Sequence, residues 1–163
     1  QLLDEKVLEM SSSLGISDGE IMEETQKILG VSNNIFYTRK RPVHLIDMGE
    51  ASCLALSKIL TNKKIENIIA IDERTTRMLG EKPENLKKLM ESILHMPIFE
   101  KKDDYKYFKG FKFIRSTELI YVAYKKGLIK MKNKNLLDAL LYSLKFKGAA
   151  ISDDEIREIE RIG

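Results

Sequence analysis

The stretches Val43-His44-Leu45-Ile46-Asp47 and Ile68-Ile69-Ala70-Ile71-Asp72 are two short apolar runs that each end in an aspartate. Runs of this length, rich in β-branched residues and bounded by charge, are typical of buried strands in a parallel sheet. Between them, Gly49-Glu50-Ala51 opens a segment with the spacing of an amphipathic helix. Because chemistry in open α/β sheets collects outside the carboxyl ends of the strands, we expect these three carboxylates to converge.

Carboxylates that converge on one point require a cation, and hard oxygen ligands favour Mg²⁺ or Mn²⁺. The sequence therefore predicts a metal site with Asp47, Glu50 and Asp72 as ligands. Each residue also has a structural alternative. Asp47 and Asp72 stand where an aspartate can cap a helix, and Glu50 lies in a first helical turn, where the helix dipole favours an acid.

The rest of the chain alternates between helical and strand patterns. Helices are predicted at residues 3–14, 17–30, 51–60, 73–79, 83–94, 117–126, 136–144 and 152–162, and strands at 43–46, 65–71 and 111–114. Residues 32–42 are predicted to be a loop, and 98–110 an exposed loop or hairpin. Strands that alternate with helices predict an α/β fold with a parallel sheet covered by helices on both faces. The length of 163 residues, without an evident linker, predicts a single domain over residues 1–163.

The net charge of +3 conceals a strong asymmetry along the chain. Residues 1–31 carry seven acidic and two basic side chains, whereas residues 101–147 carry thirteen Lys or Arg and four acids. The basic stretch also contains the aromatic residues Tyr105, Tyr107, Phe108, Phe111 and Tyr121. This combination indicates a polyanionic partner such as nucleic acid. The alternative is a solvated lysine-rich face.

Several classes of protein are excluded by composition. The single cysteine, Cys53, excludes an internal disulfide, and two histidines leave no Cys/His set for structural zinc. One cysteine is compatible with a cytoplasmic protein. No apolar stretch reaches the roughly 20 residues that span a bilayer, so no membrane partner is expected.

Four motifs in a fixed order resemble one known family. They are Leu45-Ile46-Asp47-Met48-Gly49-Glu50-Ala51, Asp72-Glu73-Arg74, Gly127-Leu128-Ile129, and Lys147-Gly148 followed by Ser152-Asp153-Asp154. Together they resemble the PIN-domain family of metal-dependent nucleases, in the branch with a Gly-Glu-Ala helix. The resemblance covers about residues 43–79 and 111–163 and leaves an insertion at about 80–110. It implies a three-layer α/β/α fold with a mostly parallel central sheet, and an acidic site for one or two Mg²⁺ or Mn²⁺ ions.

By this resemblance, Glu50 and Asp72 match the later two of the family's four acids, which implies catalytic roles for both. The family's first acid closes an N-terminal strand. No such strand precedes residue 43, so we expect it upstream of Gln1. Glu9 is the best-placed match for the second acid.

The acids and the basic stretch together predict a Mg²⁺- or Mn²⁺-dependent ribonuclease. The metal would lower the pKa of a bound water and stabilise charge on the scissile phosphate. Nucleic-acid contacts are predicted for Arg74, Lys106, Lys109 and Lys112, with bases stacked on Tyr105 or Tyr107. The resemblance also implies a toxin of a toxin–antitoxin pair, with an antitoxin protein and a second copy of the chain as partners.

Two other functions fit the same sequence. A non-catalytic PIN-like module that binds nucleic acid or protein would need the basic stretch but not the metal. A DNA-binding regulator could use residues 133–162 as a helix-turn-helix, although the acidic final helix would repel phosphate.

Overall fold

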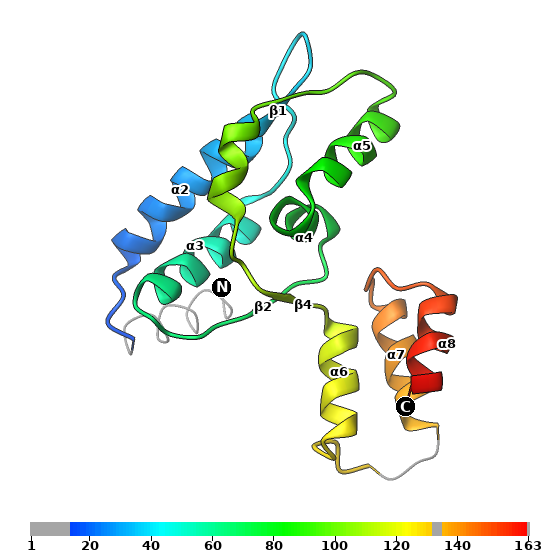
Figure 1. The fold of residues 1–163 in the computed structure, drawn as a ribbon. Helices are drawn as coiled ribbons and strands as arrows, with labels where there is room; N and C mark the ends of the chain where they lie inside the picture. Colours follow the sequence, from blue (N-terminus) through cyan, green and yellow to red (C-terminus); the bar gives the residue numbers. More distant parts are fainter. Residues whose placement is uncertain (1–13, 132–134, 163) are drawn as a thin grey trace. The chain divides into compact units, whose positions relative to one another are not determined.

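The computed structural model describes residues 14–131 and 135–162, and these residues are mostly helical (Figure 1). They form two compact units. Unit 1 comprises residues 14–69 and 75–111, and unit 2 comprises residues 70–74 and 112–162. This division does not test the prediction of one domain over residues 1–163, nor that of an insertion at about 80–110. Nearly all of the predicted helix at 3–14, including Glu9, lies outside the described residues.

Unit 1 is built around two long helices that pack along each other, α2 (Asp18–Ile35) and α3 (Met48–Asn62). Its other elements are β1 (Phe36–Tyr37), α4 (Arg74–Glu81, within the unit from Thr75), α5 (Pro83–Leu94), β3 (Phe99–Glu100) and the 3₁₀ helix η1 (Lys102–Phe108). In Figure 1 the 3₁₀ helix lies against α2. The fully buried side chains of unit 1 include Ile28, Ile35, Phe36, Leu54, Leu79, Leu86 and Phe108.

The start of α2 was predicted correctly, and its end was not. The hydroxyl of Ser17 accepts a hydrogen bond from the backbone N–H of Glu20 at 3.2 Å, as the capping pattern predicts. The predicted end at Gly30 is wrong, because the helix continues to Ile35. Ile28, Ser32 and Ile35 lie on one buried face at helical spacing, so burial on both sides of the glycine outweighs its weak helix propensity.

The predicted three-layer α/β/α fold with a mostly parallel central sheet is wrong. Within residues 14–131 and 135–162 the strands have two residues each and form two separate pairs. In unit 1, β1 pairs with β3 in antiparallel orientation, with Phe36 opposite Glu100 and Tyr37 opposite Phe99.

The predicted strand at 43–46 does not form because a side chain takes the hydrogen bonds that a neighbouring strand would make. The amide oxygen of Asn33 accepts from the backbone N–H groups of Leu45 and Ile46, at 2.6 and 3.1 Å. The Asn33 side-chain N–H donates to the carbonyl of Ile46 at 2.9 Å. The apolar side chains of this run are buried, and the backbone groups of Leu45 and Ile46 are satisfied by Asn33 of α2, while the N–H of Val43 donates to the carbonyl of Phe36 in β1.

The predicted strand at 65–71 shortens to β2 (Ile69–Ala70) for a similar reason. The backbone N–H of Ile65 donates to the carbonyl of Leu60 at the end of α3. The side-chain amide of Asn67 then donates to the hydroxyl of Thr61 and the carbonyls of Ser57 and Ile65. Ile65 and Asn67 are therefore held against the preceding helix, and the strand begins only at Ile69.

Unit 2 contains β4 (Phe113–Ile114) and three helices, α6 (Ser116–Lys125), α7 (Leu136–Phe146) and α8 (Asp153–Ile162). The backbone N–H of Ile71 donates to the carbonyl of Ile114, next to the pairing of β2 with β4. Leu137, Leu141, Ile151 and Ile156 form the core. The three helices were predicted within one or two residues of their observed ends.

No helix within residues 14–131 and 135–162 has both the length and the hydrophobicity that a bilayer crossing requires.

Candidate nucleic-acid interface

Two of the predicted metal ligands, Asp47 and Glu50, lie at the start of α3. Glu50 accepts a hydrogen bond from the backbone N–H of Asp47 at 2.9 Å, which is one half of a capping box. The Asp47 carboxylate pairs with Nε2 of His44 at 2.8 Å, and its side chain is 80% exposed. Both carboxylates therefore have partners that stabilise the helix start.

The third predicted ligand, Asp72, belongs to unit 2. Its carboxylate accepts two hydrogen bonds from Ser116, the first residue of α6, one from the backbone N–H at 2.9 Å and one from the hydroxyl at 2.6 Å. A carboxylate at this position satisfies a free N–H of the helix and interacts favourably with its dipole.

This arrangement does not give a donor set for Mg²⁺ or Mn²⁺. In the part of the chain that the structure describes, no group of three or more Asp, Glu, His or Cys side chains could hold a metal ion. Both oxygens of Asp72 are already used by Ser116. The metal site and the catalytic roles of Glu50 and Asp72 stay predictions.

The predicted nucleic-acid contacts divide between the two units. Arg74 and Lys112 are exposed residues of unit 2. Lys106 and Lys109 are exposed residues of unit 1 and line the same surface pocket, which we call the Tyr107 hollow. It has a volume of about 370 Å³ and is lined by Lys58, Thr61, Asn62, Lys106, Tyr107, Lys109, Gly110 and Phe111.

The position of the Tyr107 hollow follows from how η1 is anchored. Residues three apart lie on one face of a 3₁₀ helix, and Tyr105 and Phe108 are both buried in unit 1. The Tyr105 ring meets Phe36 edge-to-face at 6.3 Å, and its hydroxyl donates to Glu100. Burial, followed by this bond to Glu100, raises the pKa of Tyr105 well above its usual value. With these residues buried, Lys106 and Tyr107 are exposed, and Lys58 of α3 lies beside the Tyr107 ring.

Two lysines flank the Tyr107 ring. Nζ of Lys58, from α3, and Nζ of Lys106 each lie 5.6 Å from the ring centroid, within the range of a cation–π interaction. Lys58 also pairs with Glu24 of α2 at 2.6 Å. Among the described residues, Lys106 and Lys109 have no acidic partner. The hollow therefore combines an exposed aromatic ring with the positive charges of Lys106 and Lys109, which no described carboxylate neutralises.

Lys58, Thr61 and Asn62 were missed by the sequence analysis. They lie about 40 residues before the basic stretch, on a segment that the sequence identifies only as an amphipathic helix. Lys58 and Thr61 follow Leu54 by four and seven positions, and Asn62 follows Ala55 by seven, so helical periodicity places them on the same face as these buried residues and gives no sign of a polar surface. The packing that brings this face to Tyr107 is not visible in local sequence.

Comparison with known proteins does not assign a family. No protein-family model matches the chain, and no curated protein and no solved structure matches it either. The resemblance to the PIN-domain family stays a prediction. The functional argument therefore depends on the residues of the Tyr107 hollow.

Proposed function

We propose that the protein binds single-stranded RNA at the Tyr107 hollow. One observation carries the proposal: Tyr107 is 41% exposed, the Nζ atoms of Lys58 and Lys106 each lie 5.6 Å from its ring centroid, and Lys109 of the same hollow has no acidic partner among the described residues. An aromatic platform within a positive groove is the combination that binds single strands without reading their sequence.

The parts of the hollow have separate roles. A base stacks on the exposed face of Tyr107, and stacking of this kind contributes about 1–3 kcal/mol per base. Lys106 and Lys109 contact the flanking phosphates and release counterions, so each steepens the dependence of affinity on salt. The Asn62 amide, which is exposed at the edge of the hollow, can hydrogen-bond a base edge or a 2′-hydroxyl.

The ribonuclease prediction is less well supported than binding alone. Hydrolysis by a metal-activated water requires ligands that hold the ion. The described residues offer no such set, whereas the lysines and Tyr107 are present and exposed. Incubating a labelled RNA with the protein and Mn²⁺, and repeating this with Asp72→Asn, tests cleavage separately from binding.

The proposal is tested by fluorescence anisotropy with a labelled single-stranded RNA of about ten nucleotides, within the usual range of site sizes. We expect saturable binding that weakens as salt is raised. Tyr107→Ala should weaken binding by about 1–3 kcal/mol, while Tyr107→Phe, which keeps the ring, should retain most of the affinity. Lys109→Ala should lower the slope of log K against log salt by about 0.7.

The controls separate this site from general attraction of a basic protein. Lys130→Ala removes an exposed lysine of unit 2 and should leave the affinity unchanged. Heparin, which has charge but no bases, should bind wild type and Tyr107→Ala equally. The proposal is wrong if RNA does not bind saturably. It is also wrong if Tyr107→Ala, like the control Lys130→Ala, binds RNA as tightly as wild type. A DNA strand of the same sequence measures how far the 2′-hydroxyl contributes.

A further inference from the structure

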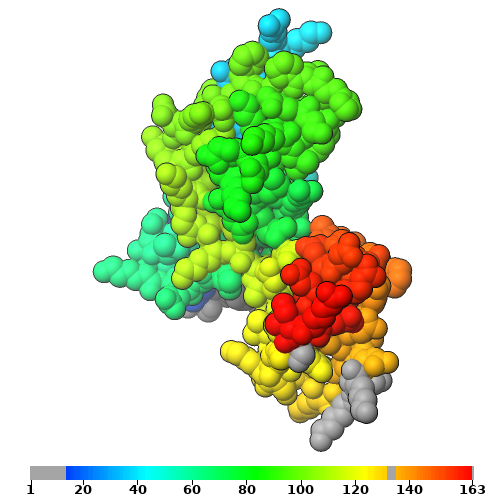
Figure 2. Space-filling model, turned by 45° about the vertical axis from the view of Figure 1, so that its right-hand side comes forward, coloured from blue at the N-terminus to red at the C-terminus, as the bar shows by residue number. Residues whose placement is uncertain are grey.

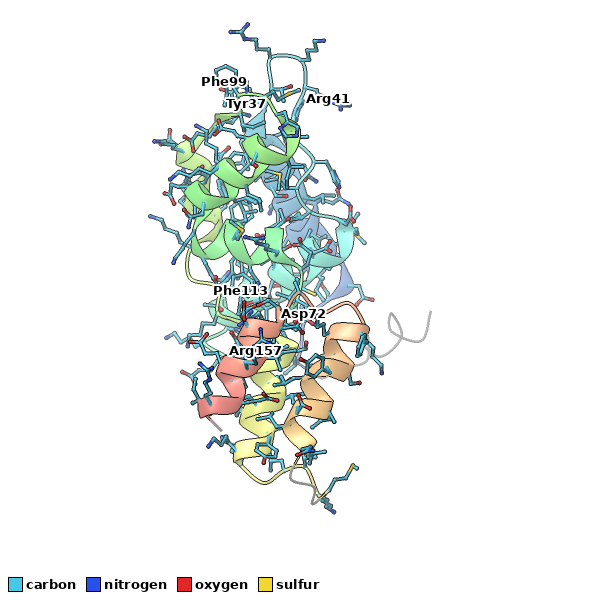
Figure 3. All side chains as sticks on the ribbon, turned by 90° about the vertical axis from the view of Figure 1, so that its right-hand side faces the viewer. Tyr37, Arg41, Asp72, Phe99, Phe113 and Arg157 are labelled. Carbon is cyan, nitrogen blue, oxygen red and sulfur yellow. The ribbon has the colours of Figure 1, made fainter. Side chains whose placement is uncertain are left out.

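A second surface pocket of unit 1 is larger than the Tyr107 hollow and has a different chemistry. We call it the Met96 groove. It has a volume of about 980 Å³ and is lined by Thr38, Arg39, Lys40, Arg41, Pro42, Val43, His44, Leu94, Met96, Pro97 and Phe99. It is thus formed by the loop that follows β1 and by the segment between α5 and β3. In Figure 3, Tyr37 and Phe99 lie together beside Arg41.

The floor of the Met96 groove is apolar and open to solvent. Leu94, Met96 and Phe99 are 38%, 47% and 41% exposed, while Val43 beneath them is buried. Contiguous exposed apolar side chains rimmed by polar residues are typical of a surface that another molecule covers. The flexible thioether of Met96 suits a groove that adapts to different apolar side chains.

Both walls of the groove are held in place. The Thr38 hydroxyl accepts hydrogen bonds from the backbone N–H groups of Lys40 and Arg41 and donates to the Arg41 carbonyl. On the other side, the Glu91 carboxylate accepts from the backbone N–H of Ile98 at 3.1 Å. A groove fixed before binding loses little conformational entropy when it is filled.

The rim of the Met96 groove is positively charged. Arg39, Lys40 and Arg41 are consecutive and exposed on the turn, and none of the described residues that line the groove is acidic. In Figure 2 this turn projects from unit 1 as the light-blue atoms. A positive rim around an apolar floor is complementary to a segment that carries acidic and large apolar side chains together.

A polypeptide fits this groove better than a nucleic acid does. Aliphatic side chains such as Val43, Leu94 and Met96 give no planar surface on which a base could stack. The ring of Phe99, which lines the groove, already stacks on Tyr37, which does not, with centroids 5.6 Å apart. The rim therefore attracts an anion, but the floor selects apolar side chains.

We infer that the Met96 groove docks an acidic segment of a partner protein that inserts Leu, Ile or Met side chains between residues 38–44 and 94–99. Carboxylates of the segment pair with the turn of Arg39, Lys40 and Arg41, and its apolar side chains cover Leu94, Met96 and Phe99. This site lies outside the residues of the Tyr107 hollow, so the inference does not depend on RNA binding.

The test uses the full chain and a labelled amphipathic peptide with Glu on one helical face and Leu on the other, about 15 residues long so that a helix can form. We expect saturable binding by fluorescence anisotropy. Replacing Leu by Ser in the peptide, or Glu by Lys, should weaken binding by at least about tenfold, because either change removes one of the two matching features.

Variants of the protein test whether the peptide binds in the Met96 groove. Arg39→Glu with Arg41→Glu should weaken peptide binding by about tenfold or more, and Met96→Ser should weaken it without changing its salt dependence. These side chains are exposed, so far-UV circular dichroism should show an unchanged fold. Lys130→Glu is the matched charge control. Unchanged affinity in the Arg39/Arg41 and Met96 variants would overturn the inference, as would displacement of the peptide by single-stranded RNA in Tyr107→Ala.

Discussion

The carboxylate of Asp72 accepts two hydrogen bonds from Ser116, one from its backbone N–H and one from its hydroxyl. Ser116 is the first residue of α6, and the two residues are 44 positions apart in sequence. Asp72 thus does for α6 what an N-cap residue usually does from the adjacent position: it satisfies a free N–H and places negative charge at the positive end of the helix.

Asp72→Ala should therefore lower the free energy of unfolding by about 1–3 kcal/mol, since it leaves the first turn of α6 without its charged acceptor. Asp72→Asn should have a smaller effect, because the amide oxygen can still accept from Ser116. Urea unfolding followed by far-UV circular dichroism measures both variants. Ser116→Ala completes a double-mutant cycle that isolates the hydroxyl bond.

The opposite result would restore the metal hypothesis for Asp72. A carboxylate held near other acids for a ligand is strained by repulsion, so its removal raises or does not change stability. If Asp72→Ala unfolds at the same or a higher urea concentration than wild type, the capping role is wrong.

Asn33 is expected to be one of the most sensitive polar residues of unit 1. Asn33→Ala removes the acceptor for the N–H groups of Leu45 and Ile46 and should destabilise the protein by about 2–4 kcal/mol, because it leaves part-buried backbone groups unsatisfied. Asn33→Asp keeps the acceptor but loses the donor to the Ile46 carbonyl, so its effect should be smaller. Equal urea midpoints for the two variants would show that the acceptor is not what holds residues 43–46.

The same asparagine explains why the helices could be predicted from sequence and the strands could not. Helix ends follow local chemistry, such as Ser152 with Glu155, whose predicted capping bonds are present at 3.1 and 2.9 Å. An apolar run such as 43–46 establishes only that its side chains are buried. Whether its backbone pairs with a strand or with Asn33, twelve residues away, depends on tertiary packing.

In the candidate site, too, the sequence identifies only the residues that are neighbours along the chain. Lys106, Lys109 and Tyr107 could be identified because they are neighbours within one basic and aromatic segment. Lys58 could not, because its position beside Tyr107 depends on how η1 packs. The parallel sheet on which the expected convergence of the acids was based does not form, because the strands are too short, and the metal site stays a prediction.

Acid should destabilise unit 2 through Glu155. The backbone N–H of Ser152 and then the guanidinium of Arg115 lower the pKa of Glu155 below its ordinary value of 4.5. A lowered pKa means that Glu155 stabilises the folded state above pH 4.5 and that this contribution disappears as the pH falls through the folded-state pKa. Its size is less than about 1 kcal/mol, because the side chain is partly exposed.

Glu155→Gln should consequently flatten the loss of stability as the pH falls below 4.5, measured by urea unfolding at each pH. Glu158→Gln, which changes an exposed carboxylate of the same helix, is the control and should keep the wild-type profile. Identical pH profiles for wild type and Glu155→Gln would contradict the role assigned to Ser152 and Arg115.

Glu24 should limit the affinity of the Tyr107 hollow for RNA. Its carboxylate pairs with Nζ of Lys58 at 2.6 Å, and both side chains are partly buried, so part of the positive charge beside Tyr107 is neutralised. Glu24→Gln removes this negative charge and should tighten binding of single-stranded RNA about three- to tenfold, with a steeper salt dependence. Glu23→Gln is the matched control, because Glu23 pairs with Lys27, on the same helix and not among the residues of the hollow. If Glu24→Gln binds RNA no more tightly than Glu23→Gln, then Lys58 does not contact the strand, and the positive charge of the hollow comes from Lys106 and Lys109 alone.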